Sequence, residues 1–279
     1  MAEHSGVTTD NATLMQRYGR LKEILNEFEK VIVAYSGGVD STFLLRAAID
    51  CLGRENVIAC LIDSELSARS EYRAAVEVAE QMGAVLEIVR PGVIEKPEFM
   101  TNRSDRCYYC KLDFFSVLTK LARQRGCDAV LCGSNADDSE DFRPGLRAEQ
   151  ESGVRGPLRE AGLTKDNIRI LSKELGLPNW DKPSQPCLAT RIIYGLEVTP
   201  KRLKQIEQGE EFLRGFGLKE LRVRHHGNLV RIEVPADEIA ELARTERCGE
   251  IVTFFRELGF TYVSLDLQGF RSGSANEAL

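Results

Sequence analysis

The sequence of 279 residues is poor in the features that mark membrane-spanning, secreted and repeat proteins. No apolar run approaches the ~20 residues that a membrane-spanning helix needs. The polar segment Met1 to Asp10 does not resemble a signal peptide, and no internal repeat or low-complexity segment stands out. These absences predict a globular protein of the cytoplasm.

A surplus of basic charge is also lacking. The formal net charge is −6, so the protein as a whole does not attract nucleic acid, and no basic patch dominates the sequence. Nucleic acid is therefore not an expected partner. Hydrophobic residues at 43% and charged residues at 29% are typical of a globular chain, whose length is sufficient for one large core or for two domains of ordinary size.

Histidine is scarce, with three residues, whereas cysteine is present eight times. In a chain without a secretory signal, cysteines indicate free thiols or metal ligands in preference to a disulfide framework. Five of them lie at helix ends, in strands or in helical segments, and we interpret these as packing residues or incidental thiols: Cys51, Cys60, Cys127, Cys132 and Cys248.

The segment that carries most chemical information begins with an apolar run, Val31 to Tyr35. The run breaks into Ser36-Gly37-Gly38-Val39-Asp40-Ser41 and then into a helical pattern, which predicts a strand-to-helix turn. Glycines allow close approach of a ligand, and the free N–H groups of a helix start favour an anion, so a phosphate group fits this loop. The predicted cofactor-binding residues of this segment are Ala34, Ser36, Gly37, Gly38, Asp40 and Ser41.

The lysine of a Walker-type loop and the spacing of a dinucleotide-binding GxGxxG are both absent from this loop. Asp40 is explained if Mg²⁺ accompanies the phosphates, although a first-turn carboxylate that favours the helix dipole is an alternative. After the next predicted strand, Ser64 is a candidate for contacting adenine or ribose, with an ordinary solvated loop as the alternative.

Further strand-like runs at Val57 to Ile62, Ala84 to Val89 and Ala129 to Gly133 alternate with helical patterns. This alternation predicts an α/β fold with a parallel sheet covered on both faces, in which ligands bind beyond the carboxyl ends of the strands. From Thr199 the pattern changes to a helix, a hairpin about His226-Gly227-Asn228, a helix over about Asp237 to Leu258 and a strand. We therefore expect two domains, 1–194 and a smaller α+β domain, 195–279.

Cys107-Tyr108-Tyr109-Cys110-Lys111 is the second unusual segment, set at the expected opening of a helix. Two thiols at this spacing can bind a metal or form a reactive pair. A structural zinc site is weakly supported because there is no second CxxC, and a thioredoxin-like dithiol does not suit a fold organised by a nucleotide loop. Cys187, in a proline-rich loop, adds a third thiol, and three thiolates suit a [4Fe–4S] cluster with one open iron.

In combination, these motifs resemble the LarE family of ATP-dependent sulfur transferases, within the adenine-nucleotide α-hydrolase (PP-loop) superfamily. The motifs that carry the resemblance run from about Leu21 to Gly273: the Ser36 to Ser41 loop, Cys107 to Lys111, Asp141 to Leu146, Cys187 to Arg191, Arg222-Val223-Arg224 and Gly269 to Gly273.

The resemblance implies adenylation of a carboxylate of pyridinium-3,5-biscarboxylic acid mononucleotide and its conversion to a thiocarboxylate, in biosynthesis of the nickel-pincer cofactor of lactate racemase. It also implies a homo-oligomer, a trimer or hexamer, and leaves the sulfide donor unknown. One family variant sacrifices the sulfur of a single cysteine, matching Cys187. The other variant binds a [4Fe–4S] cluster through three cysteines. Because Cys107 and Cys110 are present, we assign the chain to this variant.

Further site residues follow from the strand pattern and the resemblance together. Arg222 and Arg224 share one strand face and could clamp a substrate phosphate, or else form an exposed charged face. Glu233 and Arg271 could complete that pocket. Lys111 could stabilise developing charge, or be a solvated helix lysine. Rival functions are a tRNA thiolase, which the net acidity disfavours, and an amidating GMP or NAD synthetase, which has no use for the three cysteines.

Overall fold

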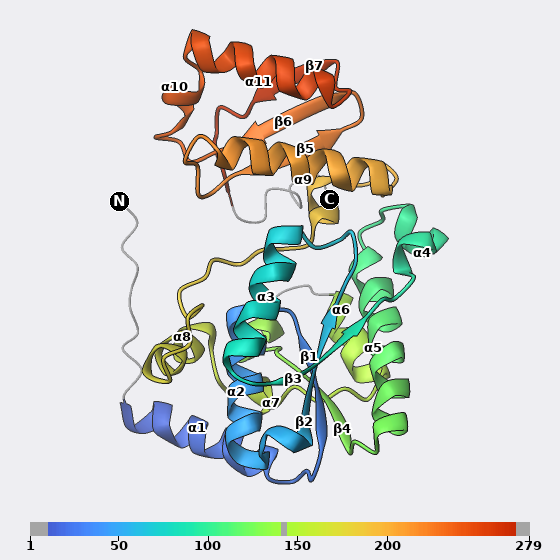
Figure 1. Ribbon diagram of the computed structural model, residues 1–279, viewed down its shortest axis with the longest axis vertical. Helices are drawn as coiled ribbons and strands as arrows, with labels where there is room; N and C mark the ends of the chain where they lie inside the picture. Colours follow the sequence, from blue (N-terminus) through green and yellow to red (C-terminus); the bar gives the residue numbers. More distant parts are fainter. Residues whose placement is uncertain (1–10, 141–143, 272–279) are drawn as a thin grey trace. The chain divides into compact units, whose positions relative to one another are not determined.

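The computed structural model describes residues 11–140 and 144–271 of the chain, and these form two compact units (Figure 1). Each unit is built from more than one stretch of the sequence. The first consists of residues up to 63 with 69–91 and 111–185, and the second consists of 64–68, 92–110 and 186 onward. The sequence predicts a single domain boundary near Tyr194-Gly195, and this boundary stays a prediction.

The first unit contains a four-stranded sheet in the order β3-β2-β1-β4. All neighbouring strands are parallel, and Val31 of β1 lies opposite Val57 of β2 and Ala129 of β4. The predicted α/β fold with a parallel sheet is confirmed. The strands are β1 (Val31–Tyr35), β2 (Val57–Ile62), β3 (Val85–Val89) and β4 (Ala129–Cys132).

Helices cover the sheet of the first unit on both sides. Figure 1 shows α2 and α3 on one side of the strands and α5 on the other, as right-handed crossovers require. The helices are α1 (Asn11–Leu25), α2 (Val39–Leu52), α3 (Arg69–Gln81), α5 (Arg106–Arg125), α6 (Pro144–Glu151), α7 (Pro157–Glu160) and α8 (Lys165–Glu174), with 3-10 turns at Arg54–Asn56 and Ala136–Glu140. The start of α5, residues 106–110, belongs to the second unit.

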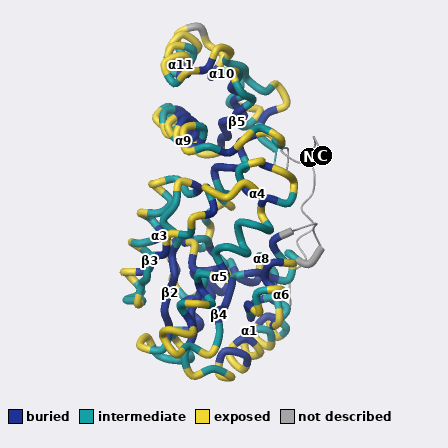
Figure 2. The backbone as a smooth tube through the Cα atoms, turned by 90° about the vertical axis from the view of Figure 1, so that its right-hand side faces the viewer, coloured by how far each residue is buried: buried dark blue, intermediate teal, exposed yellow. Residues whose placement is uncertain are grey.

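The central strand β1 explains why this sheet is stable. Val31, Ile32 and Val33 are completely buried, and Figure 2 shows the neighbouring strands β2 and β4 largely in the dark blue of buried residues. A parallel strand between two layers of helices is apolar on both faces, which is why its sequence is a continuous apolar run without alternation. The same burial holds the loop after β1 in a defined position.

The second unit contains a three-stranded sheet in the order β5-β6-β7. The predicted hairpin is confirmed, with β5 and β6 antiparallel and Gly227 at φ +81° in the turn. The predicted helix after Pro200 is also confirmed, with Thr199 as the N-cap that accepts from the Arg202 N–H. The elements are α4 (Pro97–Met100), α9 (Pro200–Arg214), β5 (Arg222–His226), β6 (Leu229–Glu233), α10 (Ile239–Leu242), α11 (Thr245–Glu257) and β7 (Tyr262–Leu265), with 3-10 turns at Val93–Glu95 and Leu188–Arg191.

The helix expected over about Asp237 to Leu258 is wrong as a single element, because the structure divides it into α10 and α11. Arg244 between them has an extended backbone, with φ −64° and ψ 143°, which ends the helical path. A new helix then starts with Glu246 in its first turn, where a carboxylate favours the helix dipole.

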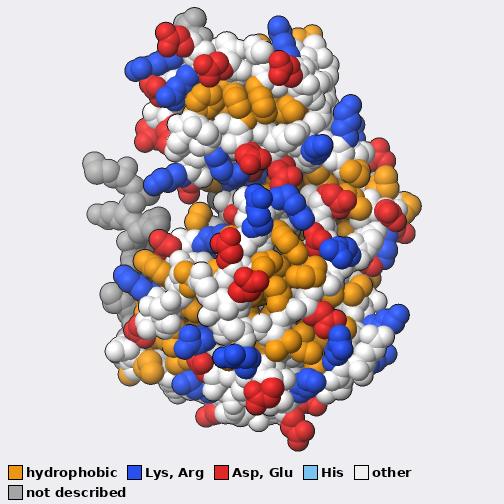
Figure 3. Space-filling view, in the orientation of Figure 1, with side chains coloured by type: hydrophobic (Ala, Val, Ile, Leu, Met, Phe, Trp, Pro, Cys, Tyr) orange, Lys and Arg blue, Asp and Glu red, His pale blue; other side chains and the backbone are white. Residues whose placement is uncertain are grey.

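Charge on the visible surface is mixed. Figure 3 shows Lys and Arg side chains interspersed with Asp and Glu on the face that it draws. In residues 11–140 and 144–271 there is no helix that combines the length and the apolar character needed to cross a membrane. Both observations agree with the composition.

Candidate active site

The loop after β1 is held by hydrogen bonds between its own residues. The Ser36 and Ser41 hydroxyl oxygens are 3.0 Å apart, and the Ser36 N–H donates to the Ser41 hydroxyl at 3.2 Å. The Ser41 hydroxyl in turn donates to the Gly38 carbonyl oxygen at 3.2 Å. Gly38 is the N-cap of α2, so the loop presents the free N–H groups of a helix start, as the sequence predicts.

Gly37 is the position in this loop that demands glycine. Its φ is +72°, and a Cβ there would lie 2.4 Å from the Cβ of Ala75 on α3. Gly38 differs, since its φ is −76°. The side-chain amide of Asn179 connects the loop to α2, since it donates to the Gly37 carbonyl at 3.0 Å and to the Thr42 hydroxyl at 2.9 Å.

Asp40, in the first turn of α2, faces a lysine that sequence reasoning missed. The Lys165 ammonium group lies 2.8 Å from both carboxylate oxygens of Asp40, and the Asn135 amide lies 3.4 Å from one of them. Lys165 is the first residue of α8, which starts with a capping box between Thr164 and Asn167. The capping box was visible in the sequence as a helix start, but its proximity to Asp40 was not.

The ends of neighbouring strands bring further polar groups to the same edge of the first unit. Gly133, directly after β4, packs so closely that a Cβ would lie 3.0 Å from the Ser41 backbone nitrogen. After β2, Asp63 pairs with Arg69 at 2.7 Å and with Arg90 at 2.8 Å. The hydrogen bond from Arg69 is the largest cause that lowers the pKa of the Asp63 carboxyl.

Ser64 is placed less favourably for the predicted role. It follows Asp63 in sequence, but it is part of the segment 64–68 that belongs to the second unit. Its hydroxyl oxygen accepts from the Leu66 N–H at 3.2 Å. The structure therefore does not group Ser64 with the loop residues of the first unit, and its contact with adenine or ribose stays a prediction.

Lys111 forms an ion pair with the buried Glu149 in the first unit. Its ammonium group lies 2.9 Å from one oxygen of Glu149, and Arg159 lies 2.9 Å from the other. Burial alone would raise the pKa of the Glu149 carboxyl, but the two cations outweigh it and hold that pKa below its usual value. Arg159 also donates to the Ser134 hydroxyl at 3.1 Å, so this network reaches the carboxyl end of β4.

The three candidate ligand cysteines belong to one unit, although CxxC and Cys187 are far apart in sequence. None of the three forms a disulfide; Cys107 is exposed, and Cys110 and Cys187 pack against the same apolar core. In the described part of the chain, no three Cys, His, Asp or Glu side chains are arranged so that they could hold a metal ion. Three thiols are thus suitable ligands for an iron–sulfur cluster. In the described residues, however, they are not arranged as a complete set of ligands.

The segments that carry these cysteines are joined by Asn102, a buried residue at φ +54°. Its side-chain amide donates to the carbonyl oxygens of Ile193 at 2.8 Å and Leu196 at 2.9 Å. The backbone carbonyl oxygen of Asn102 accepts from the Gly195 N–H at 3.1 Å. The chain before the CxxC is therefore tied to the chain after Cys187.

Other cysteines of the chain behave as packing residues. Burial raises the pKa of the Cys60 thiol to about 12 and that of the Cys132 thiol to about 11. Buried thiols of this kind stay protonated and unreactive at neutral pH.

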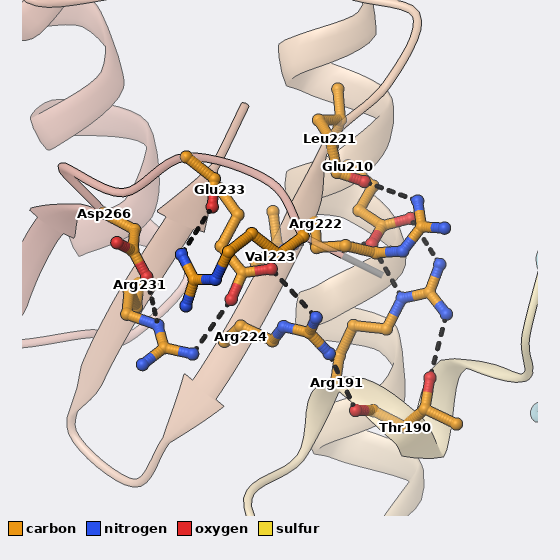
Figure 4. A network of polar contacts seen from close by, with 12 residues as sticks. Thr190, Arg191, Glu210, Leu221, Arg222, Val223, Arg224, Arg231, Glu233 and Asp266 are labelled. Carbon is orange, nitrogen blue, oxygen red and sulfur yellow. Dashed lines mark hydrogen bonds and ion pairs between the residues drawn. The ribbon is translucent and has the colours of Figure 1, made fainter. Parts of the chain in front are cut away.

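Arginines and carboxylates form a dense network in the second unit, drawn in Figure 4. Arg224 lies 2.8 Å from Glu233, which Arg231 contacts at 2.9 Å. Arg191 lies 2.9 Å from Glu210, and both side chains are only 2% exposed. The predicted alternative of a solvent-exposed charged face is wrong for Arg222 and Arg224, because both are buried.

The guanidinium of Arg222 is buried among other arginines. Burial is the first cause that lowers its pKa to about 10, and repulsion from Arg191 and Arg224 adds to it, while Glu210 opposes the shift. The guanidinium also stacks over the Phe270 ring at 4.9 Å. Guanidinium groups are common ligands of phosphates.

Two predicted features lie at the limit of what the structure describes. Arg271 is the last described residue and donates to the Gly269 carbonyl at 3.2 Å. The Asp141 to Arg143 part of the Asp141 motif and the Ser272-Gly273 end of the other lie outside the described residues.

Comparisons with known proteins agree with this arrangement. The family model described as NAD synthase matches residues 15–96, which include β1, the Ser36 loop and α2. A pyridinium-3,5-bisthiocarboxylic acid mononucleotide synthase of Lactiplantibacillus plantarum is 39% identical over 269 residues, 96% of each chain. This chain belongs to that synthase family, LarE.

Two further relatives extend over the same length. An uncharacterized protein of Synechocystis sp. is 39% identical over 266 residues, 95% of this chain and 99% of its own length. An uncharacterized protein of Methanocaldococcus jannaschii is 32% identical over 259 residues, 93% of this chain and 97% of its own. Family membership and the loop geometry together support an ATP-using enzyme.

Proposed function

We propose that the chain is an ATP-dependent sulfur transferase acting on pyridinium-3,5-biscarboxylic acid mononucleotide. The observation that carries the proposal is the match over almost the full length to a synthase of the bisthiocarboxylic acid mononucleotide. A carboxylate attacks the α-phosphorus of ATP and releases pyrophosphate; sulfide then attacks the carbonyl carbon and AMP leaves. Two rounds yield the bis-thiocarboxylate, a step toward the nickel-pincer cofactor of lactate racemase.

The loop residues and Lys165 serve the first step. A carboxylate is a poor electrophile, and adenylation turns one of its oxygens into part of a good leaving group. The N–H groups at the start of α2, with the hydroxyls of Ser36 and Ser41, suit the phosphates of ATP. Asp40 is the residue that would hold Mg²⁺, which neutralises phosphate charge when bound. Lys165 supplies the cation that the loop itself lacks.

The cysteines serve the second step. Cys107, Cys110 and Cys187 are the residues that would hold a [4Fe–4S] cluster, which supplies a sulfide nucleophile when bound. The buried arginine network suits the phosphate of the mononucleotide, with Arg222 and Arg224 as its donors and Glu233 holding Arg224 in place. Arg271 and Lys111 remain proposed members of the substrate and catalytic groups.

The rival function that uses the same Ser36 loop is that of an amidating GMP or NAD synthetase. The NAD synthase model ends at residue 96 and therefore covers none of the three cysteines. Such a ligase would be indifferent to replacement of Cys187, whereas a sulfur transferase would not. A tRNA thiolase would require a strong, salt-dependent affinity for tRNA, which the mixed surface charge of Figure 3 does not favour.

The test is an anaerobic assay of the purified full chain with ATP, Mg²⁺, sulfide and the pyridinium biscarboxylate mononucleotide. We expect pyrophosphate release that depends on the mononucleotide, and a product whose mass shows oxygen replaced by sulfur. Release of pyrophosphate with ammonia and a nicotinate or purine nucleotide, and none with the pyridinium compound, would refute the proposal.

Replacing Lys165 by methionine is expected to weaken binding of Mg·ATP by roughly 10- to 100-fold, the effect of losing one charge-assisted hydrogen bond. Lys165→Arg should retain most of the affinity, because it keeps the charge. Isothermal titration with a non-hydrolysable ATP analogue measures both. Lys173→Met, an exposed lysine on the same helix, is the matched control, and unchanged affinity in Lys165→Met would limit Lys165 to holding Asp40.

A further inference from the structure

Arg106, the first residue of α5, has a buried guanidinium for which residues 11–140 and 144–271 show no ion-pair partner. The residue is only 3% exposed, and neither its Nε nor its Nη1 has a hydrogen-bond partner among the described residues. Its side chain stacks on the Tyr194 ring at 4.5 Å, which satisfies no N–H group. Burying a polar N–H group without a hydrogen bond costs free energy.

Other buried arginines of the same unit show that this is unusual. Arg191 is paired with Glu210 at 2.9 Å and also donates to the Pro186 carbonyl oxygen at 2.6 Å. Arg224 has Glu233 at 2.8 Å. The carboxylate next to Arg106 in sequence, Asp105, lies 3.9 Å from Arg103 instead. An unpaired buried arginine therefore indicates a site whose anion comes from elsewhere.

The position of Arg106 on α5 points to the cysteines. Arg106 and Cys110 are four residues apart and so lie on one helix face, with Cys107 in the same first turn. That turn contains no acidic residue, so the helix dipole adds to the positive charge. Tyr194 belongs to the segment after Cys187, which Asn102 ties to the chain before the CxxC. Arg106 thus precedes Cys107 directly in sequence and contacts the segment that follows Cys187.

We propose that Arg106 is the buried cation that balances anionic sulfur held at Cys107, Cys110 and Cys187. This inference rests on the proposed function, in which these thiols hold an iron–sulfur cluster. Arg106 acts as a positioning residue: its N–H groups donate to sulfur, fix the first turn of α5 against the Cys187 segment and stabilise the negative charge of the bound group. On this proposal, the charge of the Arg106 guanidinium is balanced only when the anionic group is bound at the cysteines.

The test compares Arg106→Met and Arg106→Lys with Arg103→Met, an exposed arginine of the same segment whose side chain is 73% exposed. In the iron-free full chain, Arg106→Met should melt at the wild-type temperature or above it, because it removes an unpaired buried charge. After anaerobic reconstitution it should retain less iron. Its equilibrium constant for one-electron reduction should fall at least tenfold, which is 59 mV toward negative potential, whereas Arg106→Lys and Arg103→Met should stay near wild type.

Four results would overturn the inference. Lower melting temperature of iron-free Arg106→Met, with unchanged iron content and potential, would make Arg106 a structural residue. An unchanged potential with at least tenfold weaker binding of the pyridinium dicarboxylate would show that the anion is a substrate carboxylate. Wild-type protein that takes up no iron would remove the cluster itself, whereas wild-type iron uptake with indifferent variants would remove only the role of Arg106.

Discussion

Replacement of Cys187 by alanine is expected to abolish sulfur transfer, with a loss of roughly a thousandfold or more in product formation, as is usual when an essential reacting group is removed. Pyrophosphate release should continue, because the loop residues Ser36 to Ser41 belong to the other unit and keep their own hydrogen bonds. The iron content of the Cys187→Ala protein should fall together with sulfur transfer. Product quantified by mass spectrometry, pyrophosphate release and iron analysis on one preparation measure all three.

Two companion variants decide how Cys187 acts. Cys107→Ala should be as inactive as Cys187→Ala if the three thiols hold a cluster, and fully active if Cys187 sacrifices its own sulfur. In that second case, mass spectrometry of Cys187 after one turnover would show loss of its sulfur. Cys248→Ala, an exposed thiol on α11, is the control and should behave as wild type. Wild-type product formation by Cys187→Ala would exclude both routes.

Gly37→Ala is expected to destabilise the protein by about 2–5 kcal/mol and to abolish ATP-dependent activity. An L-residue at φ +72° costs about 1–2 kcal/mol, and the added Cβ would lie 2.4 Å from the Cβ and 2.9 Å from the Cα of Ala75. Overpacking of this kind costs about 1–3 kcal/mol more. Because the clash involves the α3 backbone, relief must come from movement of the loop. Urea unfolding and pyrophosphate release measure the two effects.

A matched control separates strain from clash. Gly176 has nearly the same φ, +69°, but a Cβ there meets nothing within 4 Å. Gly176→Ala should therefore show only the backbone cost, about 1–2 kcal/mol, and full activity. If Gly37→Ala is no less stable than Gly176→Ala, the close packing against Ala75 does not constrain the loop.

Local sequence was sufficient to predict the strand-loop-helix segment around Ser36, the helix after Thr199 and the hairpin about Gly227. Each of these is encoded in consecutive residues: an apolar run, a Thr-Pro helix start, a turn between alternating strands. The helix over Asp237 to Leu258 failed because the extended backbone at Arg244 carries no local signal such as proline. Helical periodicity alone does not reveal such a break.

Site residues divide in the same way. The hydroxyls and glycines of the Ser36 loop are neighbours in sequence, so their chemistry could be inferred together. Lys165 could not be connected with Asp40, since the two are separated by 125 positions and meet only because α8 starts beside α2. The burial of Arg222 and Arg224 was equally hidden, because alternation along a strand says which residues share a face and not what covers that face.

The sequence by itself determined the parallel α/β fold, the nucleotide-type loop and the family, because these depend on local periodicity and on motifs of adjacent residues. Tertiary structure alone decided that residues 92–110 join 186 onward in one unit, which brings the CxxC and Cys187 into the same body. It also decided that Arg106 is buried, with no hydrogen-bond partner for its Nε and Nη1 among the described residues. Burial and charge pairing are properties of packing between distant segments, and packing has no one-dimensional signature in the chain.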